Sequence, residues 1–416
     1  MKTDAYLEFL RYCLNPDMML PVSAKGIDWM DLMNWAEQQA IVGVIFGGIN
    51  DARSQKGDGN GKLEIPFEDL MEWVGYAHDI EEQNKLVNQR CVEVAAAFQK
   101  DGFDTCILKG QGNAMMYPNP LLRMPGDIDL WAMPRLKNEN EKLNIKEVIK
   151  YVRQRNPGAK ACYHHVDYGE FKGIEVEVHY RPSFMNNLIA NRRLQRWFNR
   201  HTEITDCEAT LRSLVEEIAE LPNNAGKITV PSWEFNVVFL LSHIYNHLIH
   251  EGVGLKQIID YFYLLRNAED QLKIENGKLI MTLRELGLME IAGAVMWVLK
   301  EVLGLEERYL IAPVDERRGR FLFAEIMDGG NFGRYGTQMT EINIVPQKEQ
   351  KGCHTDSDAT PQSLVEENTC NTDTAIGRNI LRLKRDVRLV SYFPSECLWE
   401  PIFRLWHFGW RVAYRM

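Results

Sequence analysis

The alternation of apolar and polar residues from Ile174 to Tyr180 is the feature that most constrains the fold of this chain. Successive side chains of a β-strand point to opposite faces, so Glu175, Glu177 and His179 share one face and the apolar residues between them share the other. Like charges on one face of a strand repel each other, so their presence there needs a structural or functional explanation. The segment therefore predicts a strand with one apolar face and one acidic face.

Neighbouring segments have the same β-like character, while the rest of the chain has the three- and four-residue periodicity of amphipathic helices. The expected elements are strands at Thr105–Leu108 and Gly126–Ala132, a polar helix at Glu139–Arg153, and strands at Tyr163–Phe171 and Ile174–Tyr180. The last two strands are expected to pair antiparallel around Lys172-Gly173. The predicted fold class is α+β: a small mixed sheet with flanking helices, embedded in a largely helical protein.

Changes of pattern along the 416 residues predict five segments. They are an N-terminal helical region (1–98), a core segment that holds the sheet (99–186), a helical domain (187–310), an irregular segment (311–374) and C-terminal helices that pack back on the body (375–416). Within the fourth segment, residues 347–373 contain few large apolar side chains and many polar ones. This composition predicts a mobile loop.

Two carboxylates, Asp127 and Asp129, are expected on one face of a strand, about 7 Å apart along the chain. Such a pair is tolerated most readily when a divalent cation lies between the carboxylates or when solvent screens them. If the strand Ile174–Tyr180 lies beside them, a third acid completes a one-metal or two-metal site for phosphoryl transfer. For Glu175 alone, a solvated surface acid is an equally good interpretation.

The motifs Leu108-Lys109-Gly110, Tyr117-Pro118-Asn119-Pro120, Arg123, Gly126-Asp127-Ile128-Asp129-Leu130, His164-His165 and Glu175–Tyr180 together carry a resemblance. The chain resembles the nucleotidyltransferase superfamily that includes DNA polymerase β, and more closely a poorly characterised bacterial nucleotidyltransferase family. Two features depart from the superfamily pattern: Gln111 follows Gly110 in place of Ser or Gly, and the interval from Gly110 to Asp127 is long (127 − 110 = 17).

The resemblance implies roles for seven residues. Asp127, Asp129 and Glu177 would bind the metal and serve in catalysis, Glu177 being chosen over Glu175 because it stands two residues before His179. Lys109, Gly110, Arg123 and His179 would bind the nucleotide, with backbone amides after Gly110 holding phosphate. For Lys109 and Arg123, a salt bridge that orients Asp127 or Asp129 is the competing interpretation. The implied cofactor is Mg²⁺, with Mn²⁺ as an alternative, and the implied substrate is an NTP.

Histidines elsewhere are interpreted separately. His243, His247 and His250 share one helix face, and we interpret them as packing or pocket-lining residues, with metal binding the less favoured interpretation. His164 and His165 are adjacent on a predicted strand, so they should face opposite ways and at most one should join a site.

The amino-acid composition of the chain limits which binding partners and which cell compartment are expected. The net charge of −10 works against a nucleic-acid surface, so a small molecule or a protein is the favoured acceptor. Eight cysteines without a C-x-x-C pair fit a reducing cytoplasm, and no apolar stretch approaches the length of a membrane span. The predicted activity is metal-dependent transfer of a nucleoside monophosphate from an NTP. The alternatives are a catalytically idle nucleotide-binding or regulatory module and a metal-dependent phosphohydrolase.

Overall fold

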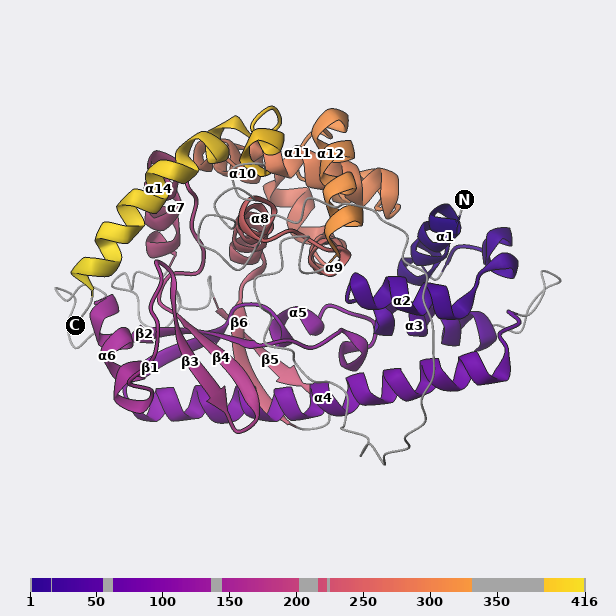
Figure 1. Cartoon of the computed structure of the whole chain (residues 1–416), viewed down its shortest axis with the longest axis horizontal. Helices are drawn as coiled ribbons and strands as arrows, with labels where there is room; N and C mark the ends of the chain where they lie inside the picture. Colours follow the sequence, from indigo (N-terminus) through magenta and orange to yellow (C-terminus); the bar gives the residue numbers. More distant parts are fainter. Residues whose placement is uncertain are drawn as a thin grey trace, which may run out of the picture.

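The computed structural model describes residues 2–15, 17–54, 63–135, 144–201, 216–222, 225–330 and 385–414 (Figure 1). Several sequence predictions fall wholly or partly outside the described residues. They include the first turn of the helix expected from Glu139, the loop 347–373, most of the irregular segment 311–374 and the first residues (375–384) of the predicted C-terminal helices.

The acidic motifs lie in and next to a four-stranded mixed sheet. Its strands are β1 (Phe103–Ile107), β2 (Ile128–Pro134), β3 (His165–Phe171) and β4 (Ile174–His179), in the order β1-β2-β4-β3. β2 pairs parallel with β4, whereas the β1–β2 and β3–β4 pairs are antiparallel. The expected hairpin turns at Lys172 and Gly173, both at positive φ (49° and 91°). The predicted strands and the α+β fold class are confirmed.

Alternation along the strands separates the two faces of this sheet. Apolar residues at every second position of β2 and β4 join one core cluster with side chains from α4 (Phe67–Lys100) and α6 (Ile145–Arg155). Asp129, Glu177 and His179 occupy the intervening positions, on the face opposite α4. On that face Trp131 stacks on Phe235 of α8 (Trp233–His250), with ring centroids 5.4 Å apart. In Figure 1, α4 runs beneath the strands and α8 lies above them.

Helices before and after the sheet share the larger core cluster. They are α1 (Lys2–Leu14), α2 (Trp29–Gln38), α3 (Val42–Ser54), α7 (Leu188–Arg200), α9 (Leu255–Arg266), α10 (Glu269–Leu286), α11 (Met289–Trp297), α12 (Glu316–Gly329) and α14 (Pro394–Ala413). Apolar residues of α8 also belong to this cluster. A short helix, α5 (Gln111–Ala114), lies between β1 and β2 in the sequence. None of the helices in the described ranges combines the length and the apolar character that crossing a bilayer requires.

A second, two-stranded sheet interrupts the region that was predicted to be helical after Asn187. Strands β5 (Glu216–Leu221) and β6 (Gly226–Pro231) pair antiparallel, and β6 contacts α4 and β1. The prediction of helices is wrong at these residues. The three glutamates of β5 interrupt the alternation of apolar and polar residues that would have indicated a strand. The β-branched run Ile228-Thr229-Val230 is too short to mark a strand by itself.

Helix α14 lies along the rim of the molecule, close to the end of β4 (Figure 1). Phe403 and Trp410 are buried and make ring contacts with Tyr163, at centroid distances of 5.8 and 6.0 Å. Phe403 also stacks on Phe184, 5.1 Å away. The helix thus closes one side of the space above the acidic face of the sheet.

Candidate active site

The three acids that the sequence singled out come together at the centre of the sheet. Asp129 on β2 is the register partner of Glu177 on the parallel strand β4, and Asp127 lies in the turn just before β2. Carboxylate oxygens of Asp127, Asp129 and Glu177 all lie within 4.8 Å of one another. Oxygen ligands at this separation suit a hard divalent cation such as Mg²⁺.

One carboxylate oxygen of the cluster has no hydrogen-bond partner within the described part of the chain. Asp129 is 1% exposed, and its Oδ2 atom is buried with no hydrogen-bond donor among the described residues. Its Oδ1 atom, in contrast, lies 3.0 Å from His179 Nε2 and 3.1 Å from Lys109 Nζ. A buried acceptor without a donor is costly, and a bound cation would satisfy it. The donor set therefore fits a metal ion.

Lys109 lies two residues after the end of β1 and reaches the same carboxylates. Burial of its ammonium acts to lower the pKa of Lys109, but the charges of Asp129, Asp127 and Glu177 outweigh burial and raise that pKa. Burial likewise acts to raise the pKa of Asp129, while Lys109 and His179 lower it overall. The salt bridge to Asp129 that was one of the two interpretations of Lys109 is present in the structure.

His179 ends β4 and joins two of the acids. Its Nε2 atom lies 3.0 Å from Asp129 Oδ1 and 3.5 Å from Glu177 Oε2. Burial acts to lower the pKa of His179, but its hydrogen bonds to these carboxylates raise it above the ordinary value. The contacts of His179 are thus with the acids that the sequence assigned to the metal.

Arg123 does not contact the acidic cluster as one interpretation expected. Its Nε and Nη2 atoms each donate to a carboxylate oxygen of Asp260 on α9, both at 2.8 Å, and Arg123 is 4% exposed. Tyr117 donates its hydroxyl to the same carboxylate at 2.6 Å. The expected salt bridge from Arg123 to Asp127 or Asp129 is wrong, because the buried carboxylate of Asp260 pairs with the Arg123 guanidinium instead. Its role toward a nucleotide stays a prediction.

Gly110 separates Lys109 from the short helix α5. Its φ of 62° favours glycine, and a Cβ atom there would approach the carbonyl oxygen of Asp127 to 3.5 Å. The backbone therefore passes close to the turn that holds Asp127. This proximity brings Gly110 and Lys109 to the acidic cluster.

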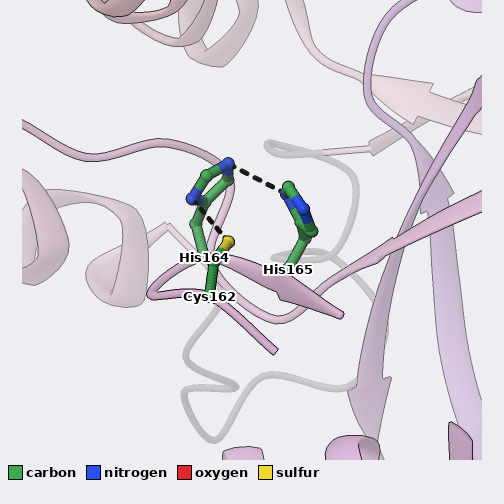
Figure 2. Close-up of side chains that lie close together, drawn as sticks. All are labelled: Cys162, His164 and His165. Atoms are coloured by element: carbon green, nitrogen blue, oxygen red, sulfur yellow. Dashed lines mark hydrogen bonds between the residues drawn. The ribbon is translucent and has the colours of Figure 1, made fainter. Parts of the chain in front are cut away.

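A second group of side chains, drawn in Figure 2, lies at the start of β3. It adjoins the acids, because His165 Nδ1 lies 3.4 Å from Glu177 Oε2. Cys162 Sγ lies 3.3 Å from His164 Nδ1, and His164 Nε2 lies 3.0 Å from His165 Nδ1. The prediction that the two histidines face opposite ways is wrong, because β3 begins only at His165 and His164 lies in the bend before it. Strand alternation therefore does not apply to this pair.

A large cavity connects these groups. It has a volume of about 1970 Å³ and is lined by both clusters, by residues of α8 and by the inner side of α14. Single ligand pockets usually measure about 300 to 1,000 Å³, so this cavity has room for two substrates together. His243, His247 and His250 line it, in agreement with the pocket-lining interpretation.

Lys256 on α9 is a lining residue to which sequence reasoning gave no role. Its ammonium donates to the carbonyl oxygen of Pro125 at 3.4 Å, beside the turn that carries Asp127. Burial and the charge of Arg123 lower its pKa to about 7, although Asp260 and Asp127 act in the opposite direction. A helical lysine 127 residues after Asp129 (256 − 129 = 127) offers no local pattern that could have identified it.

Comparisons with known proteins agree with this arrangement. A family model described as an uncharacterised nucleotidyltransferase matches residues 25–304, which is more than half of the chain. The protein therefore belongs to this nucleotidyltransferase family. No curated protein matches it.

Among solved structures, an antigenic nucleotidyltransferase-like protein from Paracoccidioides brasiliensis matches at 12% identity and a TM-score of 0.29. The match covers 58% of this chain and 97% of that one. A likeness at this level supports no inference about fold or function.

Proposed function

We propose that the protein is a metal-dependent nucleotidyltransferase that moves a nucleoside monophosphate from an NTP to an acceptor hydroxyl or a similar group. The observation that carries this proposal is the convergence of Asp127, Asp129 and Glu177, with a buried oxygen of Asp129 that has no donor among the described residues. Family membership supports the same class of reaction.

In the proposed reaction, an acceptor oxygen forms a bond to the α-phosphorus of the NTP while the bond to pyrophosphate breaks. Asp127, Asp129 and Glu177 would hold Mg²⁺, which supplies Lewis-acid activation of the phosphate and neutralises developing negative charge. Glu177 is 35% exposed on its side chain, more than Asp129, and in this proposal it accepts the proton of the acceptor hydroxyl.

Basic groups around the acids would hold the polyphosphate. Lys109 reaches the cluster from the end of β1, and Lys256 faces the same cavity from α9. His179 fixes the orientation of the Asp129 carboxylate through its 3.0 Å hydrogen bond. Arg123, held by Asp260, would act mainly by positioning the segment before β2.

The acceptor is expected to enter from the side of α14. The cavity wall there combines Phe403 and Phe408 with Arg404 and Arg411. This mixed apolar and basic lining suits a small molecule or a protein side chain with an aromatic or acidic neighbour better than it suits a long polyanion. The net charge of −10 points the same way.

Transfer of label from α-labelled NTPs, with Mg²⁺ and a panel of small-molecule and protein acceptors, tests the proposal. Wild type should transfer label, and the double variant Asp127→Asn, Asp129→Asn should lose transfer. Glu170→Gln is the matched control, because this acid lies on the exposed part of β3 and does not line the cavity. If wild type and the double variant behave alike while both remain folded, the proposal is wrong. Metal-dependent NTP binding without transfer to any acceptor would favour the idle-module alternative.

Hydrolysis is the second candidate activity, and one observation favours it. His165, Glu177 and His179 offer ligand atoms within 4.8 Å of one another, so histidines do interleave with the acids at this site. Release of free nucleoside monophosphate or phosphate in the absence of any acceptor, at a rate unaffected by acceptors, would support a phosphohydrolase.

A further inference from the structure

We propose that Cys162, His164 and His165 form a second metal site, which binds Zn²⁺ or a similarly borderline-soft divalent ion and keeps one coordination position open to the cavity. This site adjoins the acidic one, because His165 Nδ1 also lies 3.4 Å from Glu177 Oε2, but it uses a different ligand set and does not depend on the proposed nucleotidyl transfer. The three side chains point toward one another in Figure 2, from the bend before β3 and its first residue.

The three residues supply a sulfur and two imidazoles at metal-binding separation. One ligand atom from each lies within 4.8 Å of the others. A tetrahedral zinc ion takes sulfur at about 2.3 Å and nitrogen at about 2.0 to 2.1 Å, so its ligand atoms lie roughly 3.4 to 3.6 Å apart. The observed separations of 3.3 Å (Cys162 Sγ to His164 Nδ1) and 3.0 Å (His164 Nε2 to His165 Nδ1) involve different nitrogens of the His164 ring. That ring must turn because it binds one ion through only one nitrogen.

His165 is oriented as metal-binding histidines usually are. Its Nε2 atom lies 3.2 Å from Asp167 Oδ1, and this bond directs Nδ1 toward His164. A carboxylate that accepts from the distal nitrogen fixes the tautomer and raises the basicity of a metal-binding histidine. The same arrangement is found around many protein-bound zinc ions, where the carboxylate is not itself a ligand.

Ligand chemistry distinguishes this site from the acidic cluster. Asp127 and Asp129 offer only oxygen, which suits Mg²⁺ and Mn²⁺, whereas a thiolate with two imidazoles selects zinc over magnesium. Three protein ligands leave a fourth position, as in catalytic rather than structural zinc sites. All three residues line the cavity, so water or a substrate atom can occupy that position.

Cobalt substitution tests the site directly on the full-length protein. Purified protein is freed of metal and titrated with Co²⁺, and a thiolate-to-cobalt charge-transfer band is followed by absorption. Wild type should show this band at about one equivalent, and Zn²⁺ should abolish it. Cys162→Ala should lose the band. Cys91→Ala is the matched control, since Cys91 is a buried thiol of α4, and it should keep the band.

Zinc affinity by competition with a chromophoric chelator gives the second measurement. Cys162→Ala and the double variant His164→Ala, His165→Ala should each bind at least about 10-fold more weakly, and Asp167→Asn should also weaken binding by about 10-fold. Asp127→Asn with Asp129→Asn should leave the zinc affinity unchanged, whatever its effect on nucleotidyl transfer. Circular dichroism and thermal unfolding establish that each variant is folded.

Two results would overturn the proposal. One is equal Zn²⁺ affinity of wild type and Cys162→Ala in folded protein. The other is zinc binding that is lost in His179→Ala but kept in Cys162→Ala, which would assign the ion to the neighbouring group of His165, Glu177 and His179.

Discussion

Arg123 and Asp260 form a bidentate ion pair between residues 137 positions apart, with both N···O distances at 2.8 Å. Asn113 and Tyr117 donate to the same carboxylate, at 3.2 and 2.6 Å. The pair therefore fastens α9 to the segment that connects β1 with β2. Because Asp127 follows Arg123 by four residues, this buried connection fixes the turn that presents the acids.

Replacing Asp260 should destabilise the protein strongly. Asp260→Ala leaves the guanidinium of Arg123 buried without its counter-charge, and breaking a buried pair in this way costs about 3 to 5 kcal/mol. Urea denaturation followed by circular dichroism measures the loss. Glu285→Ala, at an exposed position of α10, should change the free energy of unfolding by less than about 0.5 kcal/mol. An Asp260→Ala variant as stable as this control would contradict the assigned role of the pair.

Divalent metal should stabilise the native protein through the acidic cluster. A ligand that binds only the native state at 100 times its Kd adds about 2.7 kcal/mol to the free energy of unfolding. Mg²⁺ or Mn²⁺ should therefore raise the Tm of wild type, and Asp129→Asn should abolish most of that increase. Scanning calorimetry with and without EDTA gives the measurement, with Glu170→Gln as control. An equal metal-induced increase in wild type and Asp129→Asn would exclude Asp129 as a ligand.

The acidic face could be predicted from the sequence because its information is local. The alternation in β4 and the Asp127-Ile128-Asp129 motif fix which side chains share a face. From the sequence, the neighbouring positions of β2 and β4 were only a condition, and the register of Asp129 with Glu177 satisfies it. The parallel direction of the two strands was not predicted. The resemblance to nucleotidyltransferases, carried by the same motifs, is confirmed at the level of the family.

Other parts of the site depend on contacts between distant segments, which periodicity does not encode. Asp260, on a helix more than 130 residues further along the chain, forms the ion pair with Arg123. Lys256, on the same helix, donates to the backbone just before Asp127. The orientation of His164 was mispredicted because the expected strand begins at Tyr163 whereas β3 begins at His165, and this two-residue difference leaves His164 outside the strand. Alternation of residue types locates the ends of a strand less precisely than its middle. Here the start of β3 decides whether His164 and His165 can both face the cavity.

Lys256 should contribute to the binding of an anionic substrate in a pH-dependent way. Its pKa of about 7 means that the free protein holds this amine partly neutral at neutral pH, and phosphate would favour the charged form. NTP affinity should therefore fall as the pH rises above about 7. Lys256→Met should bind NTP about 10-fold more weakly at pH 6.5, the size of one lost charge-assisted hydrogen bond, and should show a flatter pH dependence. Calorimetric titration between pH 6 and 8.5 measures both effects, and parallel pH profiles of the two proteins would contradict the prediction.

Glu396, in the first turn of α14, should make the stability of the protein depend on pH. Its carboxylate accepts from the backbone N–H groups of Asn186 and Asn187, but burial dominates and raises the pKa of Glu396 to about 7. Between the unfolded value of about 4.5 and the folded value, the native state binds more protons than the unfolded chain. The contribution of Glu396 to the free energy of unfolding is thus fully present below about pH 4.5 and declines as the pH rises to about 7, by roughly 3 kcal/mol in total.

Glu396→Gln isolates this contribution, because glutamine keeps the shape and an acceptor oxygen but does not titrate. Urea denaturation at half-unit intervals from pH 5 to 8 should show a steeper decline in stability for wild type than for Glu396→Gln, with the difference levelling off above about pH 7. All other titrating groups are common to the two proteins, so the difference between the curves belongs to position 396. If the two curves run parallel over this range, the carboxyl group of Glu396 has the same pKa in the folded and unfolded chains, and burial does not control its charge.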